Sequence, residues 1–360
     1  MHTTEVAILG AGLAGLIAAR RLCAAGIALE VLEARDRPGG RILSVDATGR
    51  PGAGGFDLGP SWFWPAAQPG MTALLHDLGV PSFAQPDDGD MLFERSADTP
   101  ALRMAGADQG AARVTGGVGA LIRALVATLP GRIRLNAPVA GLRLVPDGVI
   151  LTIAGQGAAL KARHVICTLP PRLMAGGVTL DPAGDPGMVA RWRATPTWMA
   201  PHAKLVAHYD RPFWRDSGLS GMARSLVGPL AEVHDATTAT GAAALFGFVG
   251  LPADARAAAG RDAVIAAAVA QLARLFGPQA ARPRGSFLKD WATDPCTATA
   301  QDARPSGHPA VTRAPWVIGP WATRLHLAGA ETSLSDPGLL AGAVEAGTRT
   351  ARMVLRDLGG

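Results

Sequence analysis

The chain has 360 residues, of which 48% are hydrophobic and 18% charged, with 45 glycines and 28 prolines. This length and balance are typical of a globular protein with a sizeable core and exclude an intrinsically disordered chain. The formal net charge of +5 comes almost wholly from scattered arginines, because Lys161, Lys204 and Lys289 are the only lysines, and this scatter argues against a nucleic-acid partner.

A strand, a tight turn and a helix are predicted at the start of the chain. Residues 6–9 form a short apolar run, and residues 13–25 have helical periodicity. Between them Gly10, Gly12 and Gly15 form a G-x-G-x-x-G pattern. Strand character returns just before Glu33, so the segment predicts a βαβ unit.

Further elements are predicted along the rest of the chain. Three apolar segments separated by turn-forming residues indicate a meander of strands over residues 139–145, 149–154 and 164–170. A helix is expected over residues 262–276, and a strand, a loop and a final helix, residues 340–358, close the chain.

The cysteines, histidines and apolar segments bear on the compartment and on metal binding. Cys23, Cys167 and Cys296 lie far apart, so neither a disulfide framework nor a dithiol site is predicted. The histidines show no metal-ligand spacing, so no metal is expected. No apolar run reaches about 18 uncharged residues, so no membrane partner is expected. We therefore expect a cytoplasmic protein.

Glu33 completes the pattern of a dinucleotide-binding unit. In such units the first glycine allows the turn, the second lets the backbone approach a pyrophosphate, and the third lets the helix pack on the strand. The acid binds ribose hydroxyls, and the helix N-terminus, which includes Ala14, faces the phosphates. The alternative interpretation is that these glycines only form turns and bind no cofactor.

Residues 33–42, EARDRPGGRI, favour FAD over NAD. A second glycine pair followed by an arginine is suited to a second approach to the diphosphate. The residues assigned to the cofactor here are Ala34, Arg35, Gly39, Gly40 and Arg41.

With these residues the chain resembles the flavin-containing amine oxidase family, which includes monoamine, polyamine and L-amino-acid oxidases. Residues 54–64, GGFDLGPSWFW, are similar to the family's segment beside the isoalloxazine, and residues 115–121 to the segment that opens its next helix. The resemblance implies that Val139 holds the adenine through its backbone. It also assigns four residues to the flavin segment, Leu58, Gly59, Pro60 and Ser61.

Residues 327–347 are similar to the family's C-terminal flavin signature. By that resemblance Glu331 binds the ribityl chain. A helix that starts near Gly338 would point its N-terminus at flavin N1 and the C2 carbonyl, where it stabilises the negative charge of reduction. The alternative interpretation is an ordinary C-terminal helix with no contact to a flavin. The implied cofactor residues are Gly329, Ala330, Glu331, Gly338, Leu339 and Leu340.

Lys289, in KDWATDP, stands where the resemblance implies the family's catalytic lysine, whose ammonium holds a water against flavin N5 and assists reaction with oxygen. On a strand, Lys289 and Trp291 face the same side, so Trp291 is expected to pack by the flavin. A solvated surface lysine is the alternative.

The chain departs from the family in two places. Members often flank the amine with two aromatic rings, but Leu339 stands where a tyrosine is common, and no aromatic occurs over residues 299–301. Trp62, Trp64 and Leu339 are therefore the expected substrate residues, with core packing as the alternative. Residues 71–110 are short for the family, so either a bulky substrate or a second subunit in a homodimer is expected to close the pocket.

The expected fold is α/β, with a Rossmann-like FAD-binding domain interleaved with a smaller α+β substrate domain. The FAD-binding domain is expected to comprise residues 1–70, 111–185 and 291–360, and the substrate domain residues 71–110 and 186–290.

The resemblance implies an FAD-dependent amine oxidase. The carbon beside nitrogen would give a hydride to flavin N5, O2 would reoxidise the flavin to yield hydrogen peroxide, and the imine would hydrolyse. FAD is expected to be non-covalent, because Cys296 lies near the region where some relatives attach flavin but outside their signature. A desaturase or dehydrogenase of the same fold with another electron acceptor, and a non-catalytic flavin-binding protein, remain as alternatives.

Overall fold

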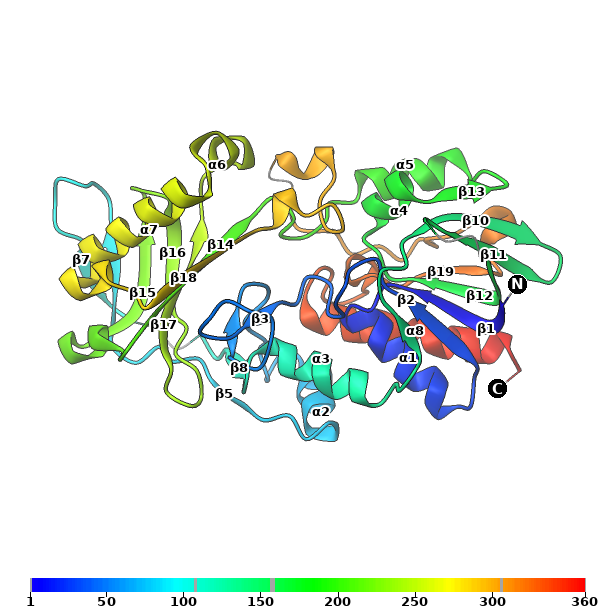
Figure 1. Ribbon diagram of the computed structural model, residues 1–360, viewed down its shortest axis with the longest axis horizontal. Helices are drawn as coiled ribbons and strands as arrows, with labels where there is room; N and C mark the ends of the chain where they lie inside the picture. The colour runs from blue at the N-terminus through cyan, green and yellow to red at the C-terminus, as the bar shows by residue number, and fades with distance from the viewer. Residues whose placement is uncertain (1, 107–108, 156–158, 305–306, 360) are drawn as a thin grey trace.

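The computed structural model describes residues 2–106, 109–155, 159–304 and 307–359. Two large sheets lie at opposite ends of the long axis of the molecule (Figure 1). The chain starts in the first sheet, visits the second, returns, visits the second again and ends on the first. This interleaving is the α/β architecture that the sequence predicted.

The first sheet has the order β13-β10-β11-β12-β1-β2-β9, and β19 also pairs with β12. β1 pairs in parallel with β2 and β12, whereas β10, β11 and β12 form the antiparallel meander expected from the sequence. The strands are β1 (His2–Leu9), β2 (Leu29–Leu32), β9 (Ile133–Arg134), β10 (Val139–Val145), β11 (Gly148–Ile153), β12 (Leu160–Cys167), β13 (Thr179–Asp181) and β19 (Leu325–Leu327).

Helices cover both faces of the first sheet. One face carries α1 (Leu13–Ala24), α2 (Pro69–Asp77), α3 (Val118–Ala127) and α8 (Leu340–Asp357), and the other carries α4 (Pro171–Gly177) and α5 (Pro186–Ala194). α1 and α8 pack against each other, which brings the two ends of the chain together. Among the described residues no helix is both long and apolar enough to span a membrane.

The second sheet has the order β18-β14-β17-β16-β15-β6-β7. Its strands are β6 (Asp90–Glu94), β7 (Leu102–Ala105), β14 (Ala203–Tyr209), β15 (Leu219–Ser225), β16 (Leu230–Asp235), β17 (Ala243–Val249) and β18 (Gly285–Asp290). α7 (Arg261–Phe276), which follows α6 (Ala253–Ala259), packs on one face and buries an apolar core there.

The opposite face of the second sheet is covered by a segment from the N-terminal part of the chain. β3 (Ser44–Val45) pairs with β4 (Phe56–Asp57), and Phe56 packs in one cluster with Val206 and Phe246 of the sheet. The remaining elements are the strand pair β5 (Ser82–Ala84) and β8 (Ala112–Val114) and 3-10 helices over Phe213–Ser217, Pro278–Ala281, Trp291–Thr293, Ala300–Ala303, Gly319–Trp321 and Ala330–Thr332.

The strands follow the expected division of the chain, but two helices cross it. Every strand of the first sheet falls in the segments expected for the FAD-binding domain, and every strand of the second in those expected for the substrate domain. Most of α2 and all of α5 lie in the latter segments. Met71 and Leu75 nevertheless join the core around α1, and Trp192 joins the core on the other face of the first sheet. Apolar helix faces pack against the nearest sheet, whatever their place in the sequence.

Candidate functional site

A cavity of about 560 Å³ joins the two parts of the molecule. Gly10, Gly12 and Glu33 line it beside the first sheet, and Trp62 and Lys204 line it beside the second. Its size is within the roughly 300–1,000 Å³ range of small-molecule and cofactor sites. We therefore take this cavity as the candidate functional site.

The three glycines of the sequence pattern shape the turn between β1 and α1. Gly10 has φ +99°, and a Cβ there would lie 2.6 Å from the hydroxyl oxygen of Thr168. A Cβ on Gly15 would lie 2.0 Å from the carbonyl oxygen of Gly10, so α1 packs directly on the turn. A Cβ on Gly12 would meet no atom within 4 Å. The N-terminus of α1 is therefore open to an anionic ligand such as a diphosphate.

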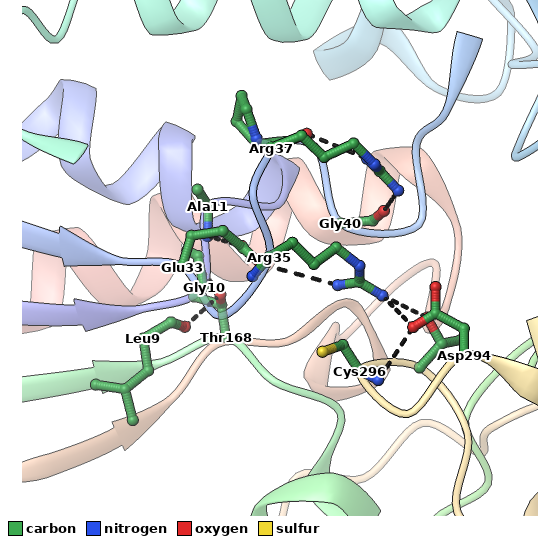
Figure 2. Close-up of polar contacts among 12 residues, drawn as sticks. Leu9, Gly10, Ala11, Glu33, Arg35, Arg37, Gly40, Thr168, Asp294 and Cys296 are labelled. Carbon is green, nitrogen blue, oxygen red and sulfur yellow. Dashed lines mark hydrogen bonds and ion pairs between the residues drawn. The ribbon is translucent and has the colours of Figure 1, made fainter. Parts of the chain in front are cut away.

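Glu33, at the end of β2, is only 3% exposed. One carboxylate oxygen accepts the backbone N–H of Ala11 at 2.8 Å, and the other accepts that of Arg35 at 2.9 Å (Figure 2). These bonds hold the carboxylate beside the glycine turn. Each oxygen keeps a further acceptor site, which fits a ribose hydroxyl pair.

Two arginines support the loop that follows Glu33. Arg35 lines the cavity, and its guanidinium donates to Asp294 at 2.7 Å and to the Thr297 hydroxyl at 2.9 Å. Arg37 does not line the cavity but donates to the carbonyl of Gly40 at 2.9 Å (Figure 2). Arg37 therefore holds the second glycine pair in place, a role that we did not assign from the sequence.

The N-terminus of α8 forms another part of the wall. Gly338 and Leu339 line the cavity just before α8, and no side chain caps the helix, so its first N–H groups are available to a ligand. Glu331 is fully buried and lies behind this wall. Its carboxylate accepts two hydrogen bonds from Arg41, at 2.6 and 3.1 Å.

Lys204, on β14, lies at the opposite end of the cavity and is 3% exposed. Its Nζ donates to the carbonyl of Gly59 at 3.0 Å and to the hydroxyl of Ser61 at 2.6 Å, and lies 3.9 Å from the ring centre of Phe246. Burial lowers the pKa of Lys204 to about 7, although the charge of Asp57 acts in the other direction. This amine can therefore take up or release a proton near neutral pH.

Lys289 lies directly opposite Lys204 in the pairing of β14 with β18, but it does not line the cavity. Its Nζ pairs with Asp294 at 2.9 Å and lies 4.6 Å from the ring centre of Trp291, and its side chain is 25% exposed. Trp291 does line the cavity, and its indole N–H donates to the carbonyl of Leu58 at 3.0 Å. Of the expected pair, the structure places only the tryptophan in the wall.

Aromatic side chains gather in the wall around Lys204. Trp62 and Trp64, both expected from the sequence, line it together with Trp198 and Phe248. The indole N–H of Trp62 donates to the side-chain oxygen of Gln85 at 2.7 Å, which sets the orientation of its ring. The wall beside the second sheet is therefore largely apolar.

Most of the residues assigned from the sequence come together in this one cavity. Those that line it are Gly10, Gly12, Ala14, Glu33, Ala34, Arg35, Gly39, Gly40, Arg41, Leu58, Gly59, Pro60, Ser61, Trp62, Trp64, Val139, Trp291, Ala330, Gly338, Leu339 and Leu340. Those that do not are Gly15, Gly329, Glu331 and Lys289.

Sequence reasoning missed several residues of the wall. They include Thr168, Met199, His202, Lys204 and Phe248. One signal could have revealed Lys204, because a lysine inside the apolar strand AKLVAHY must be buried or bound. For Met199, which precedes β14 in an irregular segment, no local pattern exists.

Comparison with known proteins assigns the family. The sequence profile described as flavin containing amine oxidoreductase matches residues 13–103 and 99–355. The chain therefore belongs to the flavin-containing amine oxidoreductases and is a flavin-dependent enzyme. This membership favours amine oxidation over carbon-carbon desaturation and over a non-catalytic role.

One similar sequence is a Mycobacterium tuberculosis protein named "Putative flavin-containing monoamine oxidase AofH". It is 27% identical over 465 aligned positions, which cover 98% of this chain and 96% of that protein. Because this chain has 360 residues, it lacks segments that the relative contains.

Solved structures show the same fold. A putrescine oxidase bound to putrescine has a TM-score of 0.83 at 22% identity, with 98% of this chain and 99% of that chain covered. Cyclohexylamine oxidase from Brevibacterium oxydans IH-35A has a TM-score of 0.81 at 22% identity, with 99% and 100% covered.

Proposed function

We propose that this chain is an amine oxidase that binds FAD non-covalently in the cavity and uses Lys204, not Lys289, as the lysine beside the flavin. The observation that carries the proposal is the position of Lys204. It is buried at the far end of the cavity from the glycine turn and is held by Gly59 and Ser61, in the segment that resembles the family's isoalloxazine segment. Lys289 instead pairs with Asp294 outside the wall.

The described residues fit FAD along the whole cavity. Glu33 is placed for a ribose, and the open N-terminus of α1 at Gly12 is placed for the diphosphate. Val139 is placed for the adenine, and the uncapped N-terminus of α8 at Leu340 for the electron-rich side of the isoalloxazine. When bound, FAD supplies the acceptor for the hydride from the carbon beside nitrogen and passes the electron pair to O2.

The chain's own residues orient the substrate, exclude water and supply a proton. Trp62 and Phe248 exclude water from the space around Lys204. Reduction of O2 to hydrogen peroxide consumes two protons, and an amine whose pKa is about 7 can hold and deliver one of them at Nζ. The amine substrate reacts in its neutral form, so no carboxylate base is required.

Two observations support the non-covalent attachment and the proposed surroundings of the enzyme. Burial raises the pKa of the Cys296 thiol, which lines the cavity, so little thiolate is available to attack the flavin. We also propose a cytoplasmic homodimer, in keeping with the free cysteines and with the segments that the chain lacks relative to the Mycobacterium protein. Acid precipitation should release the flavin into the supernatant, and light scattering should give twice the chain mass.

The test of the function is anaerobic flavin absorbance of the purified holoenzyme during titration with amines, followed by admission of air. An amine oxidase loses its flavin absorbance on addition of an amine and recovers it rapidly in air with one peroxide per turnover. Slow recovery with no peroxide would instead indicate a dehydrogenase. Unchanged absorbance with every amine would contradict the proposed function.

A further inference from the structure

We infer that the substrate is a monoamine whose remaining skeleton is apolar, such as an alkylamine or arylalkylamine, rather than a diamine, a polyamine or an amino acid. This inference rests on the proposed function, because it describes the substrate of the same site. It follows from the charges available in the cavity wall.

A second ammonium group would find no carboxylate in this wall. Among the described residues that line the cavity, Glu33 is the only acid, and both of its oxygens are bound at the ribose end. Other acids lie next to the wall and are already bonded. Asp294 is paired with Arg35, and Asp57 accepts a hydrogen bond from Ser44. Asp336 accepts a hydrogen bond from the side chain of Gln68 at 3.2 Å, and Glu331 is paired with Arg41. A diamine would therefore bury a charge without a partner, which is strongly unfavourable.

A substrate carboxylate would also lack a partner. The guanidinium of Arg35 is paired with Asp294, and that of Arg41 is paired with Glu331 through two hydrogen bonds. The remaining cation in the wall is Lys204, which the proposed function places beside the flavin and whose charge is only partial at neutral pH because burial lowers its pKa to about 7. No bidentate site for an α-carboxylate is left among the described residues of the wall.

The rest of the chamber is neutral. Burial lowers the pKa of His202 and so disfavours its charged form, and its Nδ1 has no hydrogen-bond partner among the described residues. Trp62, Trp64, Trp198 and Phe248 present ring surfaces. Such surfaces bind alkyl chains and aromatic rings well and give no compensation for a second charge.

Two matched substrate pairs test the inference on the holoenzyme. Pentylamine and putrescine have the same length and differ by a methyl group in place of an ammonium. 2-Phenylethylamine and L-phenylalanine differ by the α-carboxylate. Anaerobic flavin bleaching should give a kcat/KM about 100-fold or more higher for the monoamine of each pair. Comparable or faster bleaching by putrescine or L-phenylalanine would overturn the inference and leave the proposed oxidase intact, whereas no bleaching by any amine would remove the proposed function itself.

A binding measurement separates recognition from chemistry. α,α-Dimethyl-2-phenylethylamine and α-methylphenylalanine have no C–H beside nitrogen and cannot be oxidised there. We expect the first to perturb the flavin spectrum with a Kd at least about 10-fold lower than that of the second. Equal Kd values would overturn the inference.

A carboxylate introduced into the wall, with an uncharged control variant, gives a third test. Trp64 is half-buried, lines the cavity and makes no ion pair. W64E should raise the ratio of putrescine to pentylamine kcat/KM about 10-fold relative to W64Q, which has the same shape without the charge. The same ratio in both variants would show that the absent carboxylate does not exclude the diamine, which would contradict the inference.

Discussion

Replacing Lys204 with methionine should make the folded apoprotein more stable at neutral pH while it impairs the oxidase. The ammonium is 3% exposed, and burial lowers its pKa from 10.5 to about 7. This lowered pKa corresponds to an unfavourable free energy on the order of 5 kcal/mol for burying the charged amine. Methionine has a similar length and carries no charge.

Part of that gain is offset by lost hydrogen bonds. Gly59 and Ser61 lose the donor that Lys204 provides, at about 1–3 kcal/mol for each group left unsatisfied. We therefore expect Lys204→Met to raise the free energy of unfolding at pH 7 by on the order of 1–2 kcal/mol, and this gain should disappear as the pH rises.

The pKa difference also determines whether the free energy of unfolding rises or falls with pH. Between the native pKa of about 7 and the unfolded value of 10.5, the unfolded chain holds a proton on Lys204 that the folded chain does not. The stability of the wild type therefore gains a rising contribution with pH in this window, and Lys204→Met loses it. Urea unfolding of the apoproteins at pH 7 and pH 9, monitored by tryptophan fluorescence, measures both effects.

Lys289→Met is the matched control, because it removes the lysine directly across the same strand pair. Its loss breaks a partly exposed ion pair with Asp294, so stability should fall by about 1 kcal/mol or less. Stopped-flow reoxidation by O2 should slow in Lys204→Met and remain close to wild type in Lys289→Met. A loss of stability above about 2 kcal/mol in Lys204→Met, or slow reoxidation in Lys289→Met alone, would refute this reasoning.

Three further substitutions test the rest of the cavity. Gly15→Ala places a Cβ 2.0 Å from the carbonyl oxygen of Gly10, so calorimetry should show a loss of about 3 kcal/mol and a lower flavin content, and a normal holoenzyme would contradict the close packing. Glu33→Gln removes a charged acceptor at the ribose end, so fluorescence titration should show roughly 10- to 100-fold weaker FAD binding, and unchanged affinity would exclude a ribose contact. Arg41→Met leaves the fully buried Glu331 unpaired, so urea unfolding should show a loss of about 3–5 kcal/mol that Glu331→Gln partly restores in the double variant.

The cofactor end of the cavity could be predicted from the sequence because its parts are local. Gly10, Gly12, Gly15 and Glu33 belong to one βαβ unit, and the spacing of strand, turn and helix brings them together without help from distant residues. The same holds for the start of α8, where Gly338 lies just before the N-cap residue Leu339.

Other parts of the site depend on contacts between distant segments. Trp198 and Phe248 reach the wall through an irregular segment and a strand of the second sheet, and neither follows a local pattern. α2 carries Met71 onto the core of the first sheet, although the chain order suggested the other part of the molecule. The sequence therefore indicated two rings of the wall, Trp62 and Trp64, but not that Phe248 lies in the same wall.

The choice between the two lysines was decided by tertiary structure alone. Lys204 and Lys289 are cross-strand partners, and both stand in short strands beside apolar neighbours. β14 is an interior strand, paired on both sides and covered by the segment that carries Gly59, so Lys204 is buried in the cavity. β18 is the edge strand, and Lys289 turns to Asp294 in the loop that follows it. The sequence by itself predicted a flavin site and assigned Lys289 to it. The order of strands in a sheet, which long-range pairing sets, determined which lysine faces it.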